Sequence, residues 1–245
     1  MARVFIIAIL FKLFFSTIGF TQSALGIRAF LQYRKLVYIA QNPDITEQEL
    51  IRNGLLDASK HVKNLHIDIR NSSTNNFLGK DVYGNFCKCY LQPDVVNKLA
   101  KAAQMLDTIA EGIHLLALDC ARPLSVQQKM WDALEMPAAE KGKYVSNPAN
   151  HSVHNYGAAI DITLCDETGK ELDMGTPYDF FGPEAYPYAE NDMVAKGKLT
   201  EDQVNRRRLL RRILESQRFR NVAHEWWHFN LYTREVAKKK FKVIY

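Results

Sequence analysis

Hydrophobic and polar positions follow two different periods along this chain, and the longer period predicts four helices. Between residues 93 and 111 the apolar residues recur every three or four positions, as in a helix that buries one face. Capping-box sequences, in which Ser or Thr is followed three residues later by Glu or Gln, begin at Thr46, Ser125 and Thr200. We expect a helix to start at each of these three residues.

The shorter period and the apolar runs predict four strands. His66–Ile69 and Ala158–Leu164 alternate between faces, and Leu115–Leu118 is a continuous apolar run of the kind found in buried strands. Trp226–Tyr232 also alternates and is rich in aromatic residues, which favour strands. This mixed order indicates an α+β fold, and we expect a single domain with a central, mainly antiparallel sheet that carries the functional site and is flanked by helices.

Three segments show neither period. Pro137–Asn150 is expected to be a loop. Gly175–Asn191 is rich in Pro, Gly and Tyr, and we expect an ordered loop beside the functional site. The lysines at positions 238–240 are expected to lie in a solvated tail.

The first residues have the pattern of a secretory signal peptide. Arg3 precedes an apolar run that small residues close at Ser23–Ala24. The alternative is an uncleaved membrane anchor, but Lys12 would cost about 2.5–3.5 kcal/mol at a bilayer centre. We therefore expect a signal peptide at 1–23, a domain at 24–245 with its core at about 53–232, and a secreted or periplasmic protein that touches a membrane only through an uncleaved signal.

The charge of the chain argues against nucleic acid as a partner. The formal net charge is +5, and loss of Arg3 and Lys12 with the signal lowers it to +3. The arginines at positions 206–208, 211 and 212 fall on one predicted helix. A solvated face with salt bridges is a better interpretation of them than a binding patch.

The four cysteines leave their pairing open. Three complete pairings of Cys87, Cys89, Cys120 and Cys165 are possible, and an exported protein permits disulfides. The spacing of Cys87 and Cys89 does not suit a zinc knuckle. Nothing in the sequence marks a base for Cys120 as a nucleophile.

The string His224-Glu225-Trp226-Trp227-His228 matches the helical zinc signature His-Glu-x-x-His. That signature needs a helix, but the aromatic, alternating sequence predicts a strand. In a strand His224 and His228 would lie roughly 13 Å apart, too far to share an ion. We therefore expect only His228 to be a metal ligand.

A second string supplies two more candidate ligands. Asp161 lies on the polar face of its predicted strand, and Gly157 allows the chain to turn so that His154 approaches it. With His228 these residues form a His, His, Asp set that suits Zn²⁺. Glu225, three residues before His228, is placed to take a proton from water at that ion. Each histidine alone would be interpreted as a core or surface residue.

The two strings resemble the zinc D-Ala-D-Ala metallopeptidases, which include D,D-carboxypeptidases, L-alanyl-D-glutamate endolysins and dipeptidases of the vancomycin-resistance type. The matching pattern is Ser-x-His-x-x-Gly-x-Ala-x-Asp at 152–161 and Glu-x-Trp-His at 225–228. Further stretches resemble the dipeptidase branch: 64–70, 74–80, 119–123, 173–181 and 205–210. The cysteines and the basic tail depart from the family, but none of them occupies a ligand position.

The resemblance implies a metal centre and a catalytic pair. His154, Asp161 and His228 would hold one Zn²⁺. Glu225 would act as general base and then as acid toward the leaving amine. Arg122 would stabilise the oxyanion, although a structural salt bridge is its alternative role.

The resemblance also implies a substrate. Ser152 would bind the carboxylate of a small D-amino-acid dipeptide and Asp179 its ammonium group, with a loop or helix cap as the alternative role of Asp179. We expect hydrolysis of D-alanyl-D-alanine to two D-alanines in cell-wall peptide turnover or salvage, with glycopeptide resistance as another setting. The alternatives are a D,D-carboxypeptidase or L-alanyl-D-glutamate endopeptidase on stem peptides, or a non-catalytic, zinc-stabilised binding domain. The sequence does not predict the oligomeric state.

Overall fold

A five-stranded sheet organises the residues that the computed structural model describes, 45–84 and 86–245. In spatial order its strands are β2 (Leu65–Ile67), β4 (Ile113–Asp119), β5 (Ala159–Asp166), β7 (Glu225–Asn230) and β6 (Arg220–Val222). Only the β2–β4 pair is parallel, so the prediction of a mainly antiparallel sheet is confirmed. A second, two-stranded sheet pairs β1 (Leu56–Asp57) with β3 (Tyr90–Leu91).

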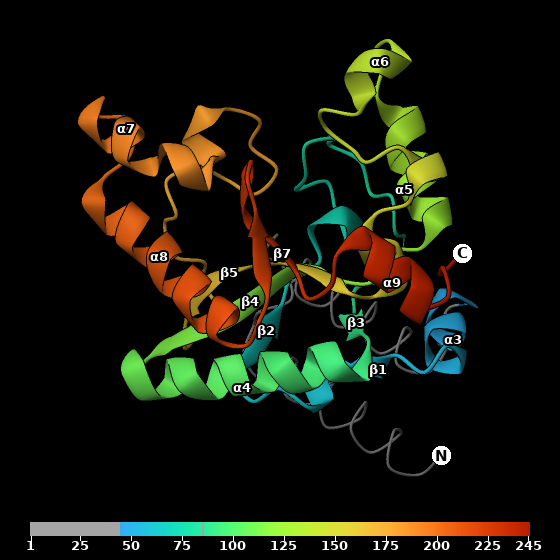
Figure 1. The fold of residues 1–245 in the computed structure, drawn as a ribbon, viewed down its shortest axis with the longest axis horizontal. Helices are drawn as coiled ribbons and strands as arrows, with labels where there is room; N and C mark the ends of the chain where they lie inside the picture. Colours follow the sequence, from blue (N-terminus) through green and yellow to red (C-terminus); the bar gives the residue numbers. More distant parts are fainter. Residues whose placement is uncertain (1–44, 85) are drawn as a thin grey trace, which may run out of the picture. The chain divides into compact units, whose positions relative to one another are not determined.

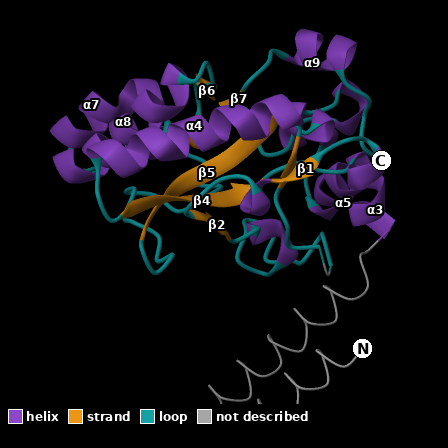
Figure 2. Cartoon of the chain, turned by 90° about the horizontal axis from the view of Figure 1, so that it is seen from below, coloured by secondary structure: helices purple, strands orange, loops and turns teal. Residues whose placement is uncertain are grey.

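Two long helices pack along the sheet on one side, as Figure 2 shows. They are α4 (Pro93–Ile109) and α8 (Glu201–Ser216), which contact β4 and β5 respectively and also contact each other. The shorter helices flank this core (Figure 1): α3 (Ile45–Arg52), α5 (Leu124–Ala133), α6 (Ala138–Lys141), α7 (Glu190–Ala195) and α9 (Arg234–Lys240). The α+β class expected from the sequence is therefore observed.

The two long helices form for the reasons visible in their sequences. Pro93 stands at the first position of α4, where its fixed φ suits a helix. An N–H at this position would have no partner within the helix, so proline loses no hydrogen bond there. At the start of α8 the backbone N–H of Gln203 donates to Thr200 Oγ1 at 3.2 Å, and Thr200 N–H donates to Gln203 Oε1 at 2.8 Å. The predicted capping box of α8 is thus confirmed.

The other two predicted caps are wrong. Helix α3 has already begun at Ile45, one residue before Thr46. Helix α5 begins at Leu124, directly after Pro123, so Ser125 lies inside its first turn and makes no cap bond. Proline supplies the helical entry here without a side-chain acceptor.

The segments predicted as loops contain short helical pieces. Helix α6 and a 3₁₀ turn at Pro148–Asn150 lie inside the first. Two 3₁₀ turns, at Pro183–Ala185 and Pro187–Ala189, lie inside the second, which then enters α7. The predicted solvated tail is helix α9 instead, and its Lys240 Nζ lies 2.5 Å from Asp94 Oδ2.

The basic stripe of α8 is only partly a solvated face. Arg207 is completely buried: it donates to Met174 O at 2.6 Å and to Glu184 O at 2.7 Å, and its guanidinium lies 5.3 Å from the Trp226 ring. The interpretation of these arginines as a solvated face is therefore wrong for Arg207, which ties the 174–184 segment to α8 and β7.

The N-terminal prediction lies outside the described residues, which begin at Ile45. The expected signal peptide at 1–23 and the segment 24–44 stay predictions. Residues 45–245 form one compact unit, which includes the predicted core. Within the described part of the chain, no helix has the length and apolar character needed to cross a bilayer.

Replacing Arg207 with methionine tests its structural role. We expect the free energy of unfolding to fall by about 3–5 kcal/mol, because the carbonyls of Met174 and Glu184 lose their charged donor inside the protein. The matched control is Arg212→Met on the exposed face of the same helix, which should change it by no more than about 0.5 kcal/mol. Urea unfolding followed by tryptophan fluorescence measures both, and equal losses would contradict this role.

Candidate active site

Three side chains from separate parts of the chain meet at one end of the sheet. Asp161 on β5 and His228 on β7 are directly opposed in the strand register, so both side chains point to the same face. His154 lies in the 3₁₀ turn Val153–Tyr156, which ends at Gly157 with a left-handed φ of 63°. A Cβ at Gly157 would lie 2.7 Å from Leu55 Cδ2, so the turn that brings in His154 needs glycine.

The ligand atoms of these residues form a triangle of metal-site dimensions. His154 Nε2 lies 3.2 Å from His228 Nδ1 and 3.4 Å from Asp161 Oδ1, and His228 Nδ1 lies 2.9 Å from Asp161 Oδ1. Ligands at zinc distances in a tetrahedron are separated by about 3.3 Å. Among the described residues no other set of three His, Cys, Asp or Glu side chains converges in this way. The donor set therefore fits a metal ion.

Hydrogen bonds behind the two imidazoles fix their tautomers. His154 Nδ1 lies 2.6 Å from the carbonyl oxygen of Cys120, and His228 Nε2 lies 3.0 Å from Asn230 Oδ1. Because both oxygens can only accept, the protons belong on these outer nitrogens. The inner nitrogens then present lone pairs to a metal, as second-shell acceptors commonly arrange.

Asp161 is held in place on the side away from the histidines. Tyr178 donates its hydroxyl proton to Asp161 Oδ2 at 3.1 Å, and Arg122 Nη2 lies 3.7 Å from the same oxygen. The sequence offered no signal for this contact of Tyr178. Its hydroxyl leaves Oδ1 of the carboxylate directed at the imidazoles.

The pKa values of the cluster reflect its coupled charges. Burial opposes the charge of Asp161, but His154 and His228 outweigh it and hold the pKa of Asp161 below its usual range. Burial likewise opposes the charge of His228, but Asp161 outweighs it and raises the pKa of His228 to about 9. In the metal-free protein at neutral pH, a proton therefore bridges the pair where a cation would bind.

Arg122 forms a buried salt bridge and also lines the pocket. It donates to Asp119 Oδ2 from Nε at 2.8 Å and from Nη2 at 2.6 Å, and Nη1 donates to Gln127 Oε1 at 3.0 Å. Burial opposes its charge, but Asp119 outweighs this and raises the pKa of Arg122. The salt bridge that was the alternative role of Arg122 is present, and it directs a permanently charged group into the pocket.

A disulfide braces the segment that carries these contacts. Cys89 beside β3 is joined to Cys120, the residue that follows β4, and this selects one bond among the pairings that the sequence left open. Cys120 also supplies the carbonyl that accepts from His154. The thiol of Cys165 is buried in the sheet, and burial raises its pKa to about 12. The disulfide thus includes the residue whose carbonyl oxygen orients the candidate metal ligand His154.

Glu225 lies at the edge of the triangle. Its Oε2 is 3.7 Å from His228 Nδ1, and it lines the same pocket as the three candidate ligands. Burial raises the pKa of Glu225, and the imidazoles partly oppose that effect. A carboxylate whose pKa moves toward neutrality is better matched to general acid–base work.

Asp179 and Ser152 occupy other parts of the pocket wall. Asp179 has a left-handed φ of 59°, and its buried Oδ2 has no hydrogen-bond partner among the described residues. Burial, together with repulsion from Asp161 and Glu225, raises the pKa of Asp179 well above its usual range. Ser152 caps the turn that carries His154, accepting from His154 N–H at 3.4 Å. Oδ2 of Asp179 thus has no hydrogen-bond donor among the described residues, and the charge of Arg122 only partly offsets the burial of this carboxyl group.

His224 does not join the cluster. Helical geometry is absent at this position, because residues 225–230 form β7, as the aromatic alternation predicted. The His224 ring instead packs edge-on against Tyr186, with ring centroids 4.8 Å apart. The expectation that His228 and not His224 approaches the other candidate ligands is confirmed.

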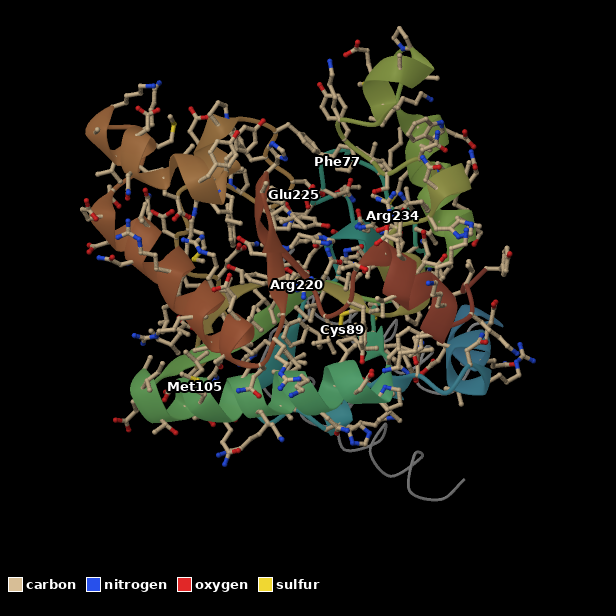
Figure 3. All side chains as sticks on the ribbon, in the orientation of Figure 1. Phe77, Cys89, Met105, Arg220, Glu225 and Arg234 are labelled. Carbon is tan, nitrogen blue, oxygen red and sulfur yellow. A yellow bond between two sulfur atoms is a disulfide. The ribbon has the colours of Figure 1, made fainter. Side chains whose placement is uncertain are left out.

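The pocket itself is small and polar, with a cavity volume of about 70 Å³. Phe77 and Glu225, labelled in Figure 3, belong to its wall. Every residue that the sequence proposed for chemistry or substrate binding lines this cavity: Arg122, Ser152, His154, Asp161, Asp179, Glu225 and His228.

Several supporting residues were not identified from the sequence. Asp119 was part of a recognised motif but had no role, although it holds Arg122 and also accepts from Tyr83 Oη at 2.7 Å. Asn230 follows His228 by two residues and orients its ring. The strand period offered a signal for Asn230, since residues two apart share a face.

Metal affinity should depend on pH because of the proton held by His228. That proton must leave before Nδ1 can bind an ion. Below the pKa of about 9 for His228, Zn²⁺ affinity should therefore rise about tenfold per pH unit and level off above it. Competition with a chromophoric chelator between pH 6.5 and 8 measures the slope. His224→Ala should keep it, and an affinity independent of pH would contradict the assignment.

Removing the disulfide should weaken the metal site as well as the fold. The double variant Cys89→Ser, Cys120→Ser should lose about 3–4 kcal/mol of unfolding free energy. Its Zn²⁺ affinity should fall by about tenfold or more, because the carbonyl that orients His154 loses its tether. Cys165→Ala is the control that should retain zinc affinity. A less stable double variant with unchanged zinc affinity would show that the disulfide serves the fold alone.

Comparison with known proteins agrees with the geometry of the site. Residues 51–245 match the peptidase family Peptidase_M15, described as D-ala-D-ala dipeptidase. The D-alanyl-D-alanine dipeptidase of Escherichia coli (strain K12) is 30% identical over 177 residues, which are 72% of this chain and 84% of that protein. The D-alanyl-D-alanine dipeptidase of Enterococcus faecalis (strain ATCC 700802 / V583) is 29% identical over 195 residues, 74% of this chain and 93% of that protein. The chain therefore belongs to the D-ala-D-ala dipeptidase family of peptidases and is a hydrolase.

Proposed function

We propose that this chain hydrolyses the D-alanyl-D-alanine dipeptide to two D-alanines, with one Zn²⁺ held by His154, Asp161 and His228. The observation that carries the proposal is the meeting of two features in one small cavity. A triangle of metal-ligand atoms lies in the same pocket as Asp179, a buried carboxylate whose Oδ2 has no partner among the described residues. The first feature supports hydrolysis, and the second supports a substrate with a free ammonium group.

The chemistry divides between the ion and the protein. When bound, Zn²⁺ would supply a water of lowered pKa and polarise the scissile carbonyl. Glu225 takes the proton of the attacking water on its carboxylate. It then passes that proton to the leaving amine. The raised pKa of Glu225 serves both steps, since one group must accept and then donate near neutral pH.

Arg122 supplies positive charge where the carbonyl oxygen becomes negative. Its guanidinium cannot swing freely, because Asp119 and Gln127 hold it. A donor fixed before the reaction stabilises the transition state without reorganisation, by about 2.7–4 kcal/mol in comparable sites. The buried salt bridge therefore supports the oxyanion role.

The two ends of the substrate find different partners. Asp179 accepts the ammonium group, which supplies the counter-charge that its Oδ2 lacks. Ser152, two residues before His154, provides a hydroxyl for the substrate carboxylate. A peptide whose D-Ala-D-Ala lies at the end of a longer stem brings no ammonium group to Asp179. Burial of that unpaired carboxylate would oppose its binding.

The N-terminal sequence pattern supports one setting for this activity. A secreted or periplasmic enzyme meets dipeptide released from the cell wall and not the cytosolic precursor pool. We therefore place the activity in turnover or salvage of wall peptides, and glycopeptide resistance is the less direct use.

The proposal predicts a specific pattern of product release. The purified protein with Zn²⁺ should release D-alanine from D-Ala-D-Ala, and chelation should abolish this. L-Ala-L-Ala and a stem pentapeptide should be poor substrates. Glu225→Gln should bind Zn²⁺ as the parent does and lower kcat by about 10²–10⁴-fold, the range for a lost general base.

Three outcomes would redirect the proposal. Trimming of the pentapeptide with D-Ala-D-Ala left intact would assign the chain to the carboxypeptidase branch. Cleavage between L-alanine and D-glutamate would assign it to the endopeptidase branch. Zinc binding without turnover of any of these peptides would indicate a binding domain.

A further inference from the structure

Three aromatic side chains meet beside the pocket, outside the groups that the proposed chemistry uses. Phe181 is the centre of this trio. Its ring centroid lies 5.2 Å from that of Phe77 and 4.6 Å from that of Tyr144, and both contacts are edge-to-face. Phe77 and Tyr144 also line the cavity that holds the candidate ligands. Phe77 and Tyr144 are therefore part of the wall around the metal-ligand triangle, and Phe181 packs against both of them.

The three rings come from segments far apart in the sequence. Phe77 follows β2, Tyr144 follows α6, and Phe181 precedes α7. Helices α6 and α7 stand on opposite sides of the view in Figure 1, so the contact between Tyr144 and Phe181 joins the two sides. No sequence period relates these residues, and only the fold brings them together.

The exposure of the rings shows that they are not ordinary core. Phe181 is 39% exposed and Tyr144 is 37% exposed, and Tyr144 also lines the cavity, so the trio lies where solvent and pocket meet. Side chains in this position form a thin partition between solvent and site. Their removal widens the pocket more than it disturbs the core.

The partition stands at the ammonium end of the proposed substrate. Phe181 follows Asp179, the carboxylate without a partner at Oδ2, by two residues. A substrate whose amino group meets Asp179 ends at this wall. A peptide extended beyond that amino group must continue through the space that the rings occupy.

We propose that Phe77, Tyr144 and Phe181 form an aromatic wall that limits the substrate to a free dipeptide by blocking N-terminal extension. This inference rests on the proposed dipeptidase function and adds the residues that set substrate length. Asp179 rejects extended peptides by charge, and the aromatic wall rejects them by volume. The electrostatic and the steric effect act on the same end of the substrate, and mutations can separate them.

The test compares two substrates in each variant: D-Ala-D-Ala and the extended tripeptide L-Lys-D-Ala-D-Ala. Phe181→Ala should raise the ratio of kcat/KM for the tripeptide to that for the dipeptide by about tenfold, mainly through a lower KM for the tripeptide. Phe181→Leu keeps most of the bulk and should change the ratio by less than about threefold. Because Asp179 is intact in both variants, its preference for an ammonium group cancels in the comparison.

A second position and a matched control complete the design. Tyr144→Ala removes another ring of the trio and should move the ratio in the same direction. Tyr188→Ala removes a tyrosine that is 68% exposed and makes an edge-to-face contact with His224 outside the trio, and it should leave the ratio unchanged. If Phe181→Ala and Tyr144→Ala lowered kcat/KM by the same factor for both substrates, the proposed role of the aromatic wall would be wrong.

A further readout separates this proposal from the proposed function. If the parent protein leaves D-Ala-D-Ala intact, the dipeptidase function fails, but access to the metal site is still measurable. Extraction of Zn²⁺ by the chelator EDTA should be about tenfold faster from Phe181→Ala than from the parent, because the partition is gone. Equal extraction rates in the parent and the variant would overturn the aromatic wall whatever the substrate.

Discussion

The site depends on one buried carboxylate, that of Asp119. Completely enclosed at the end of β4, it accepts from Arg122 Nε and Nη2, from Tyr83 and from the backbone N–H of Cys120. Through these bonds it positions two groups that the proposed reaction needs. One is the guanidinium that faces the pocket, and the other is the Cys120 backbone, whose carbonyl orients His154. Loss of this carboxylate would leave a buried arginine uncompensated, which is far more costly than loss of a surface ion pair.

The second constraint is the register between β5 and β7. Asp161 and His228 are opposed, so their side chains share a face without any side-chain bond being needed to align the strands. A shift of one residue would turn His228 to the other face and separate the candidate ligands. Asn221 resists such a shift, because its amide group donates to the carbonyl of His228 at 2.8 Å and to that of Glu225 at 2.9 Å. The geometry of the metal triangle is thus set mainly by backbone pairing.

Much of the fold followed from local patterns in the sequence, and the exceptions share a cause. Helices α4 and α8 and the central strands were predicted because their periodicity and their burial agree. The predicted caps at Thr46 and Ser125 were wrong, because a capping-box sequence shows only which hydrogen bonds are possible. It does not show that α3 begins before Thr46 or that α5 begins directly after Pro123. Arg207 resembled its exposed neighbours on α8, because its burial depends on carbonyls from residues 174 and 184, which sequence alone does not place nearby.

For the site, the sequence indicated the groups that would carry chemistry but not those that hold them. Asp119 and Tyr178 act through contacts with residues 3 to 36 positions away, and their roles depend on burial that the sequence does not state. Pairing of Cys89 with Cys120 was likewise one choice among three until β3 and the end of β4 were seen side by side. Long-range partners of this kind are fixed by the assembled sheet.

The charge balance of the pocket links the metal, the base and the substrate in the proposed complex. Asp119 neutralises Arg122, which leaves Asp161, Asp179 and Glu225 as carboxylates in one small cavity. Burial and mutual repulsion raise the pKa values of Asp179 and Glu225. A divalent ion would relieve the charge around Asp161, and a substrate ammonium would relieve that of Asp179. A neutral amide at the same position would not offset the charge of Asp179. Electrostatics alone therefore favours the binding of a free dipeptide over that of the end of a longer chain.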